Sequence, residues 1–166
     1  MYLLSTNEPG SINCNNRIAL VNTFRKLWEQ HDLWTRSFII SDAENLKDLQ
    51  LVTKRLLRNP SDFADALQKY YGKDYAQKFD TLLTAHLTIA ADLVNAAKAG
   101  NTESVNTIRT KWYKNAEDIA DFLSSINPYW SKNQWRNLLF DHLKLVENEA
   151  TLRLNKDYAK DIALYD

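Results

Sequence analysis

Residues 24–38 read FRKLWEQHDLWTRSF, and their pattern recurs along the chain. Apolar side chains fall three and four positions apart, at Phe24, Leu27, Trp34 and Phe38, and His31 takes the remaining place in that series. This spacing puts all five side chains on one face of an α-helix. The stretch therefore predicts a long amphipathic helix whose buried face carries a histidine.

The same pattern occurs twice more. Each further stretch has an aromatic residue, a leucine three positions later and a histidine four positions after that, so all three histidines of the protein share one heptad position. The members are Phe79, Leu82, His86, Ile89 and Leu93 in one stretch, and Trp135, Leu138, His142, Leu145 and Glu149 in the other. Three helices of one kind are predicted.

Helix-breaking residues divide the chain, because it contains only three glycines and three prolines. We expect an N-terminal arm, partly ordered, over 1–15 and one domain of about five long amphipathic helices over 16–166. The expected helices cover about 16–40, 43–71 with a break at Pro60, 73–99, 102–126 and 131 to the end. Ser41-x-x-Glu44 and Ser131-x-x-Gln134 both fit the capping-box pattern of a helix start.

The connections between these helices are short, which favours an up-and-down bundle in which consecutive helices are antiparallel. Helices 16–40, 73–99 and 131 onward should then run parallel to one another. No stretch shows sustained alternation of apolar and polar residues, so no β-sheet is expected. The predicted fold class is all-α.

An internal repeat of a helical hairpin is also predicted, with an offset of 56 residues between its two copies. Residues 62–67 (DFADAL) align with 118–123 (DIADFL), and His86 aligns with His142 without a gap. Because 56 is a whole number of heptads, matching leucines alone would mean little. The matching aspartates and histidines are not imposed by helix packing, so we interpret the offset as a duplication.

Composition limits the class of protein. The chain has 166 residues, of which 45% are hydrophobic, and 21 basic residues balance 21 acidic ones. A formal charge of zero provides no attraction to nucleic acid or to an anionic membrane, so neither is an expected partner. We find no signal peptide and no transmembrane run, and Cys14 is the single cysteine, which suits a reducing compartment. A cytoplasmic location is expected.

The three histidines and Glu149 are the candidate site. A single histidine in a core is usually neutral and hydrogen-bonded, and this interpretation stays open for all three. Three at one level on parallel helices could instead hold a divalent transition metal such as zinc or iron, or line a ligand pocket. Glu149 occupies an apolar position, so we expect it to pair with a histidine or to contact the metal. Four tryptophans near the apolar stripes should be largely buried: Trp28, Trp34, Trp112 and Trp135.

Several longer runs resemble a family of uncharacterised small all-helical bacterial proteins, whose members are often labelled acetylglutamate kinase. The resemblance covers nearly the whole chain from Arg17, and it rests on residues 27–40, 55–63, 89–98, 112–116 and 126–131. It implies a helical fold but no established activity and no catalytic residues. Relatives extend past the position of Asp166, which implies a shortened end here. The kinase label conflicts with the sequence, because three glycines cannot supply phosphate-binding loops.

Two functions follow from these observations. The first is a non-catalytic bundle that binds a small ligand or a protein partner, a second copy of the chain included, because no catalytic motif is present. The alternative is a metal-binding bundle, for example a metal-dependent hydrolase or a redox or oxygen protein, with His31, His86 and His142 as ligands. In outline this alternative resembles the three-histidine bundles of the DinB-like group, which place paired histidines on one helix.

Overall fold

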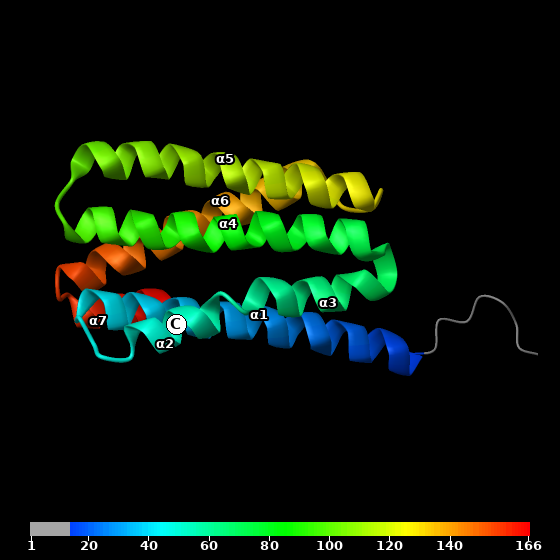
Figure 1. The fold of residues 1–166 in the computed structure, drawn as a ribbon, viewed down its shortest axis with the longest axis horizontal. Coiled ribbons are helices and arrows are strands. Elements are labelled where there is room, and N and C mark those ends of the chain that lie inside the picture. Colours follow the sequence, from blue (N-terminus) through cyan, green and yellow to red (C-terminus); the bar gives the residue numbers. More distant parts are fainter. Residues whose placement is uncertain (1–13) are drawn as a thin grey trace, which may run out of the picture.

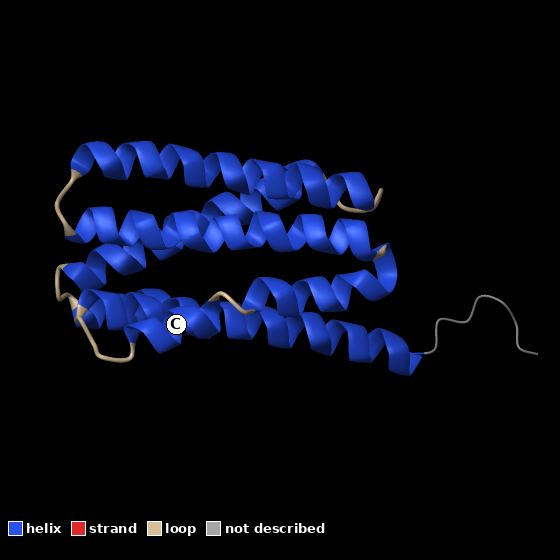
Figure 2. Ribbon diagram, in the orientation of Figure 1, coloured by secondary structure: helices blue, strands red, loops and turns tan. Residues whose placement is uncertain are grey.

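The computed structural model describes residues 14–166, which form seven α-helices. No residue in this range lies in a β-strand, which confirms the all-α fold class (Figure 2). The segment 43–71 is divided into two helices as predicted, with the break at residues 57–58 rather than at Pro60, whereas the segment from 131 onward contains two helices instead of one. The helices are α1 (Cys14–Ala43), α2 (Leu49–Leu56), α3 (Asn59–Tyr71), α4 (Lys73–Lys98), α5 (Thr102–Ile126), α6 (Lys132–Leu154) and α7 (Tyr158–Tyr165).

The long helices lie side by side in an up-and-down arrangement (Figure 1). Successive helices pack on one another from α3 to α6, and α1 contacts α3, α4 and α6. Figure 1 shows α1, α4 and α6 running in one direction and α3 and α5 in the other. The predicted parallel orientation of the three histidine-bearing helices is therefore confirmed.

Local sequence explains most of the helix ends. Gly72 joins α3 to α4 at a φ of 86°, a left-handed conformation that glycine adopts without strain. Asn101 caps α5 by accepting a hydrogen bond from the backbone N–H of Ser104 at 3.0 Å. Ser131 caps α6 in the same way, with the N–H of Gln134 as donor at 3.4 Å. The predicted helix start at Ser131 is thus confirmed.

The predicted helix start at Ser41 is wrong. Ser41 is buried inside the last turn of α1, which continues to Ala43 and is followed by Asn45 at a φ of 53°. The next helix, α2, begins only at Leu49. The Ser-x-x-Glu pattern therefore lies at the end of one helix rather than the beginning of the next.

The core face of α6 differs from the predicted stripe. Leu138 and Leu145 are 63% and 51% exposed, whereas Leu139 and Val146 are buried. Since α6 packs against α5 and α7 as well as α1 and α4, its buried face is turned by about one position. His142 consequently lies at the edge of this face and is only half-buried.

The tryptophans are buried to different degrees. Trp112 is 2% exposed, as predicted, and Trp34 and Trp135 are half-buried. The prediction is wrong for Trp28, which is 37% exposed. Trp28 contacts Phe63 with one edge of the ring, at 4.8 Å between ring centres. The indole is thus packed on one side and open on the other.

Two further predictions from the sequence concern an N-terminal arm and the absence of a transmembrane segment. The proposed arm over 1–15 lies outside the described residues, except for residues 14 and 15, which begin α1. None of the helices described over 14–166 is both long enough and apolar enough to cross a bilayer.

Candidate functional site

The three histidines meet between α1, α4 and α6, and we call them the histidine triad (His31, His86 and His142). Their ring centres are 6.5 Å apart for His31 and His86, 5.7 Å for His31 and His142, and 6.0 Å for His86 and His142. His31 and His86 are 3% and 2% exposed. Equal heptad positions on parallel helices bring the rings together, as the sequence predicts.

An asparagine on α3 fixes the ring of His31. The Nδ1 atom of His31 lies 3.1 Å from Oδ1 of Asn59, and Nδ2 of Asn59 donates a hydrogen bond of 3.0 Å to the carbonyl of Leu27. Asn59 is fully buried. Its amide therefore bridges the imidazole and the backbone one turn before it.

An asparagine on α5 makes the same contacts with His86. Nδ1 of His86 lies 2.9 Å from Oδ1 of Asn115, whose Nδ2 donates to the carbonyl of Leu82 at 3.1 Å. Trp112, one turn earlier on α5, donates its indole N–H to the carbonyl of His86 at 3.1 Å. Both the ring and the backbone of His86 are thus held from α5.

These contacts fix the tautomer of two imidazoles. An amide oxygen can only accept a hydrogen bond, so Nδ1 of His31 and of His86 must carry the proton. In the neutral ring the Nε2 atom then has a free lone pair. Within residues 14–166, the side-chain hydrogen bonds of these two rings run through Nδ1 alone. This is the state in which a histidine binds a metal or accepts a proton from a ligand.

Burial keeps the triad neutral. Loss of hydration and, to a smaller extent, the nearby His142 lower the pKa of His31 to about 4, against the opposing effect of the hydrogen bond to Asn59. Burial likewise lowers the pKa of His86 to about 3, with smaller contributions from the other two histidines. The pKa of His142 is also lowered by burial, against the attraction of Asp32. At neutral pH all three rings are uncharged.

A small cavity lies between the three rings. Seven apolar or indole side chains complete its wall, and the imidazoles are the only ionisable groups in it. It offers about 10 Å³ to the centre of a water-sized sphere. That is room for one water molecule or one metal ion, and far too little for an organic ligand.

The spacing of the triad is close to that of a metal site but wider. Three rings at these separations share a central point about 3.5 Å from each ring centre, whereas a metal bound at about 2.0–2.1 Å by a ring nitrogen lies about 3.2 Å from it. With the side chains placed as they are, residues 14–166 contain no group of three or more His, Cys, Asp or Glu residues that could hold a metal ion. Metal binding would therefore require the histidine side chains to move.

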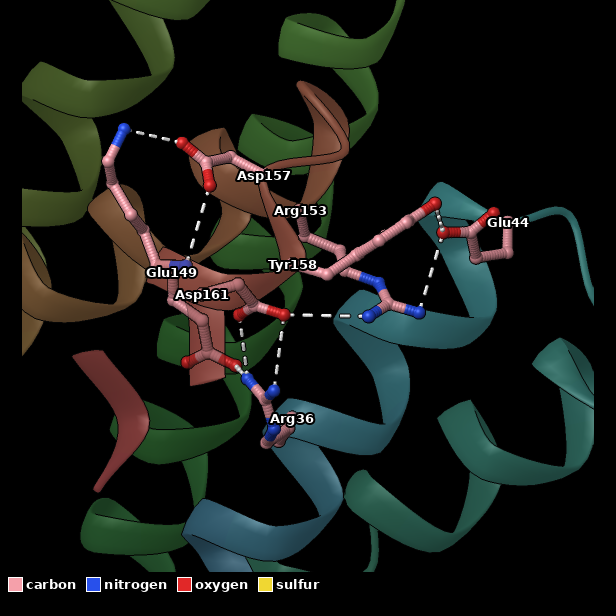
Figure 3. A network of polar contacts seen from close by, with 8 residues as sticks. Arg36, Glu44, Glu149, Arg153, Asp157, Tyr158 and Asp161 are labelled. Carbon is pink, nitrogen blue, oxygen red and sulfur yellow. Dashed lines mark hydrogen bonds and ion pairs between the residues drawn. The ribbon is translucent and has the colours of Figure 1, made fainter. Parts of the chain in front are cut away.

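Glu149 does not belong to this centre, and the prediction that it pairs with a histidine is wrong. Its carboxylate accepts a hydrogen bond of 2.6 Å from Nη1 of Arg36 (Figure 3). Arg36 also binds both carboxylate oxygens of Asp161 on α7, at 2.8 and 3.1 Å. Two turns separate Glu149 from His142, which amounts to about 10 Å along α6. The carboxylate therefore reaches a cation on α1 instead of the triad.

Figure 3 shows that this second polar cluster ties α7 to α1 and α6. Asp161 is completely buried and also contacts Arg153 at 3.5 Å, and Arg153 in turn lies 3.4 Å from Glu44. Burial raises the pKa of Glu149, while Arg36 opposes that increase. Each buried carboxylate has a guanidinium partner, so the cluster fits a structural role.

The sequence analysis missed Asn59 and Asn115, although a signal for them was present. The two asparagines are 56 residues apart, which is the offset of the predicted repeat. Both also lie on the apolar stripes of their helices, Asn59 between Leu56 and Phe63 and Asn115 between Trp112 and Ile119, where a polar residue indicates a buried partner. A comparison of polar identities at that offset would have paired them.

Comparison with protein-family models, with curated proteins and with solved structures gives no match for this chain.

Proposed function

We propose that the protein binds a divalent transition metal, such as zinc or iron, through the histidine triad. The supporting observation is that Asn59 and Asn115 fix the protons of His31 and His86 on Nδ1, beside a cavity of ionic size. Outer hydrogen bonds of this kind orient histidines in many metal sites. Three nitrogen ligands would leave a coordination position for water or a ligand.

The low pKa values favour the same function. Metal binding competes with protons for the ring nitrogen, and rings that stay neutral well below pH 7 offer no such competition. Burial also opposes metal binding, because no carboxylate lines the cavity to offset the charge of the metal ion. Glu149 and Asp161 are both engaged by Arg36. A site of this kind holds a metal with a net positive charge and attracts an anionic or lone-pair ligand.

A titration of metal-free protein with Zn²⁺ tests the proposal. The chain has only three histidines, so every imidazole that binds zinc belongs to the triad. We expect one equivalent to bind, and His86→Gln to weaken binding at least 100-fold. Asn115→Ala should weaken it 10- to 100-fold, since an outer hydrogen bond to a ligand is lost. Asn95→Ala, an exposed asparagine on α4, is the matched control and should change nothing.

Equal zinc binding by the native chain and His86→Gln, or no binding by either, would reject the metal centre. Circular dichroism on each variant shows whether the fold is retained. If the metal centre is rejected, the triad is a hydrogen-bonded part of the core. The proposed function is then the first one, a non-catalytic bundle that binds a small ligand or a protein partner. A metal-dependent hydrolase or redox activity would be examined only after binding is established.

Other parts of the functional assignment are proposals too. The duplication of a helical hairpin is supported by polar identities, because Asn59 and Asn115 keep the same 56-residue offset as His86 and His142. Membership in the family of small bacterial helical proteins and a cytoplasmic location rest on the sequence alone. The proposal that neither nucleic acid nor a membrane is a partner also rests on the sequence, through its formal charge of zero.

A further inference from the structure

An aromatic pocket lies next to the triad, at the end of the bundle where α1, α4 and α6 begin. Its volume is about 210 Å³, and none of the eight side chains that line it is ionisable. Three of them are indoles, those of Trp28, Trp130 and Trp135, and three more are phenyl rings. An apolar cavity of about 150 Å³ is known to hold benzene, so this pocket has room for a molecule of one or two rings.

The rings of the pocket are packed edge to face. Trp28 and Phe63 meet at 4.8 Å and 62°, and Trp130 and Trp135 at 5.9 Å and 70°. Phe24 and Phe63 lie 6.2 Å apart at 44°. Edge-to-face and tilted contacts are the arrangements that aromatic rings prefer, and an aromatic guest can join the cluster through contacts of the same kind.

The pocket shares a wall with the cavity of the triad. Four residues line both spaces, namely Trp28, Phe79, Leu123 and Trp135. Trp28 also contacts His31, at 5.5 Å between ring centres. A molecule in the pocket would therefore be separated from the imidazole nitrogens only by these shared side chains.

The pocket also reaches the surface. An outer groove of about 650 Å³ shares Phe24, Trp28 and Trp130 with it. Tyr70 at the groove is 56% exposed and Val21 is 47% exposed. Trp28 lines all three spaces in turn. Groove, pocket and cavity thus lie next to one another in this order from the surface to the triad.

We propose that this pocket binds an uncharged aromatic molecule of one or two rings. The absence of ionisable side chains disfavours an anionic guest, because a buried negative charge would have no partner. Binding of the ring depends neither on a metal nor on the proposed function.

Ligand-observed nuclear magnetic resonance with toluene, phenol and benzoate tests this on the full chain, after treatment with a chelator. We expect toluene and phenol to bind and benzoate to bind at least tenfold more weakly. Leu67→Phe should fill the pocket and weaken phenol at least tenfold, because Leu67 is buried in its wall. Leu93→Phe is the matched control, since Leu93 is equally buried but lines a different cavity. Phe24→Ala removes a half-buried wall and should weaken phenol severalfold without threatening the fold.

Equal affinity for benzoate and phenol, or no effect of both Leu67→Phe and Phe24→Ala, would overturn the proposal. If the resonance changes depend on the protein concentration and not on the phenol concentration, the pocket is occupied by a second copy of the chain. That result would also overturn the proposal. Repeating the titration with Zn²⁺ separates the two proposals. If zinc does not bind while phenol still does, the metal centre fails and the aromatic site stands.

Discussion

Acidification should destabilise this bundle strongly, because folding keeps His31 and His86 neutral. Burial lowers their pKa values to about 4 and about 3, whereas an unfolded histidine titrates near 6.5. Between pH 6.5 and pH 4 the unfolded chain therefore binds more protons than the folded one. The free energy of unfolding then falls as pH falls. Above pH 6.5 these two rings contribute no pH dependence.

The size of the effect follows from the same values. At pH 5 each histidine favours the unfolded state by about 2 kcal/mol relative to pH 7.5. Two such histidines remove about 4 kcal/mol, which is a large part of the 5–15 kcal/mol typical of a domain. The pKa of His142 is lowered in the same direction, so it adds to the loss. Glu149 acts in the opposite sense at lower pH, because its pKa is raised in the folded state.

Urea unfolding of chelator-treated protein, followed by circular dichroism from pH 7.5 to pH 5, measures this dependence. His86→Gln is the informative variant, because glutamine can still donate to Asn115 but cannot titrate. Its stability should fall by about 2 kcal/mol less than that of the native chain over the same range. Glu149 is present in both proteins, so its contribution cancels. A flat profile for the native chain, or equal slopes for the two, would refute the assignment of neutral buried histidines.

Three further changes should alter stability in ways that the contacts define. Asn115→Ala leaves an imidazole N–H and a backbone carbonyl without partners and should cost about 2–4 kcal/mol in urea unfolding, while Asn95→Ala should cost little. Arg36→Ala leaves the buried Glu149 without a cationic partner and Asp161 with only its 3.5 Å contact to Arg153, and should cost about 3–5 kcal/mol at pH 7. Lys114→Ala, in an exposed ion pair, should leave the melting temperature unchanged. Trp112→Phe removes a buried indole and its hydrogen bond and should cost about 2–3 kcal/mol; a loss below about 0.5 kcal/mol would contradict its place in the core.

Hydrophobic periodicity predicted the fold class and the meeting of the histidines, because both depend on which residues share a helix face. It correctly predicted that His31 and His86 are buried, because α1 and α4 bury the faces that carry these residues. It failed on α6, where Leu139 and Val146 replace Leu138 and Leu145 in the core. The face that a helix buries depends on all the helices that pack against it. For α6 these are α1, α4, α5 and α7, and the periodicity of one helix does not contain their positions.

Glu149 shows a second limit of the sequence. Its apolar position correctly indicated a buried carboxylate in need of a partner, and it is 6% exposed. The partner, Arg36, is 113 residues away on another helix, and no spacing rule links the two. Asp161 lies on a short helix that the sequence analysis did not separate from α6. Polar partners between helices that are distant in sequence come only from the tertiary arrangement.

The asparagine bridges also bear on how the chain folds. Asn59 and Asn115 connect residues fewer than 35 positions apart, so Asn59 closes a short loop over α1 to α3 and Asn115 one within the α4–α5 hairpin. The triad requires α1, α4 and α6 together, which are far apart along the chain. We expect the hairpins to form first and the histidine centre to assemble last. Amide hydrogen exchange during refolding would then protect α3 and α5 before α6 closes on α1.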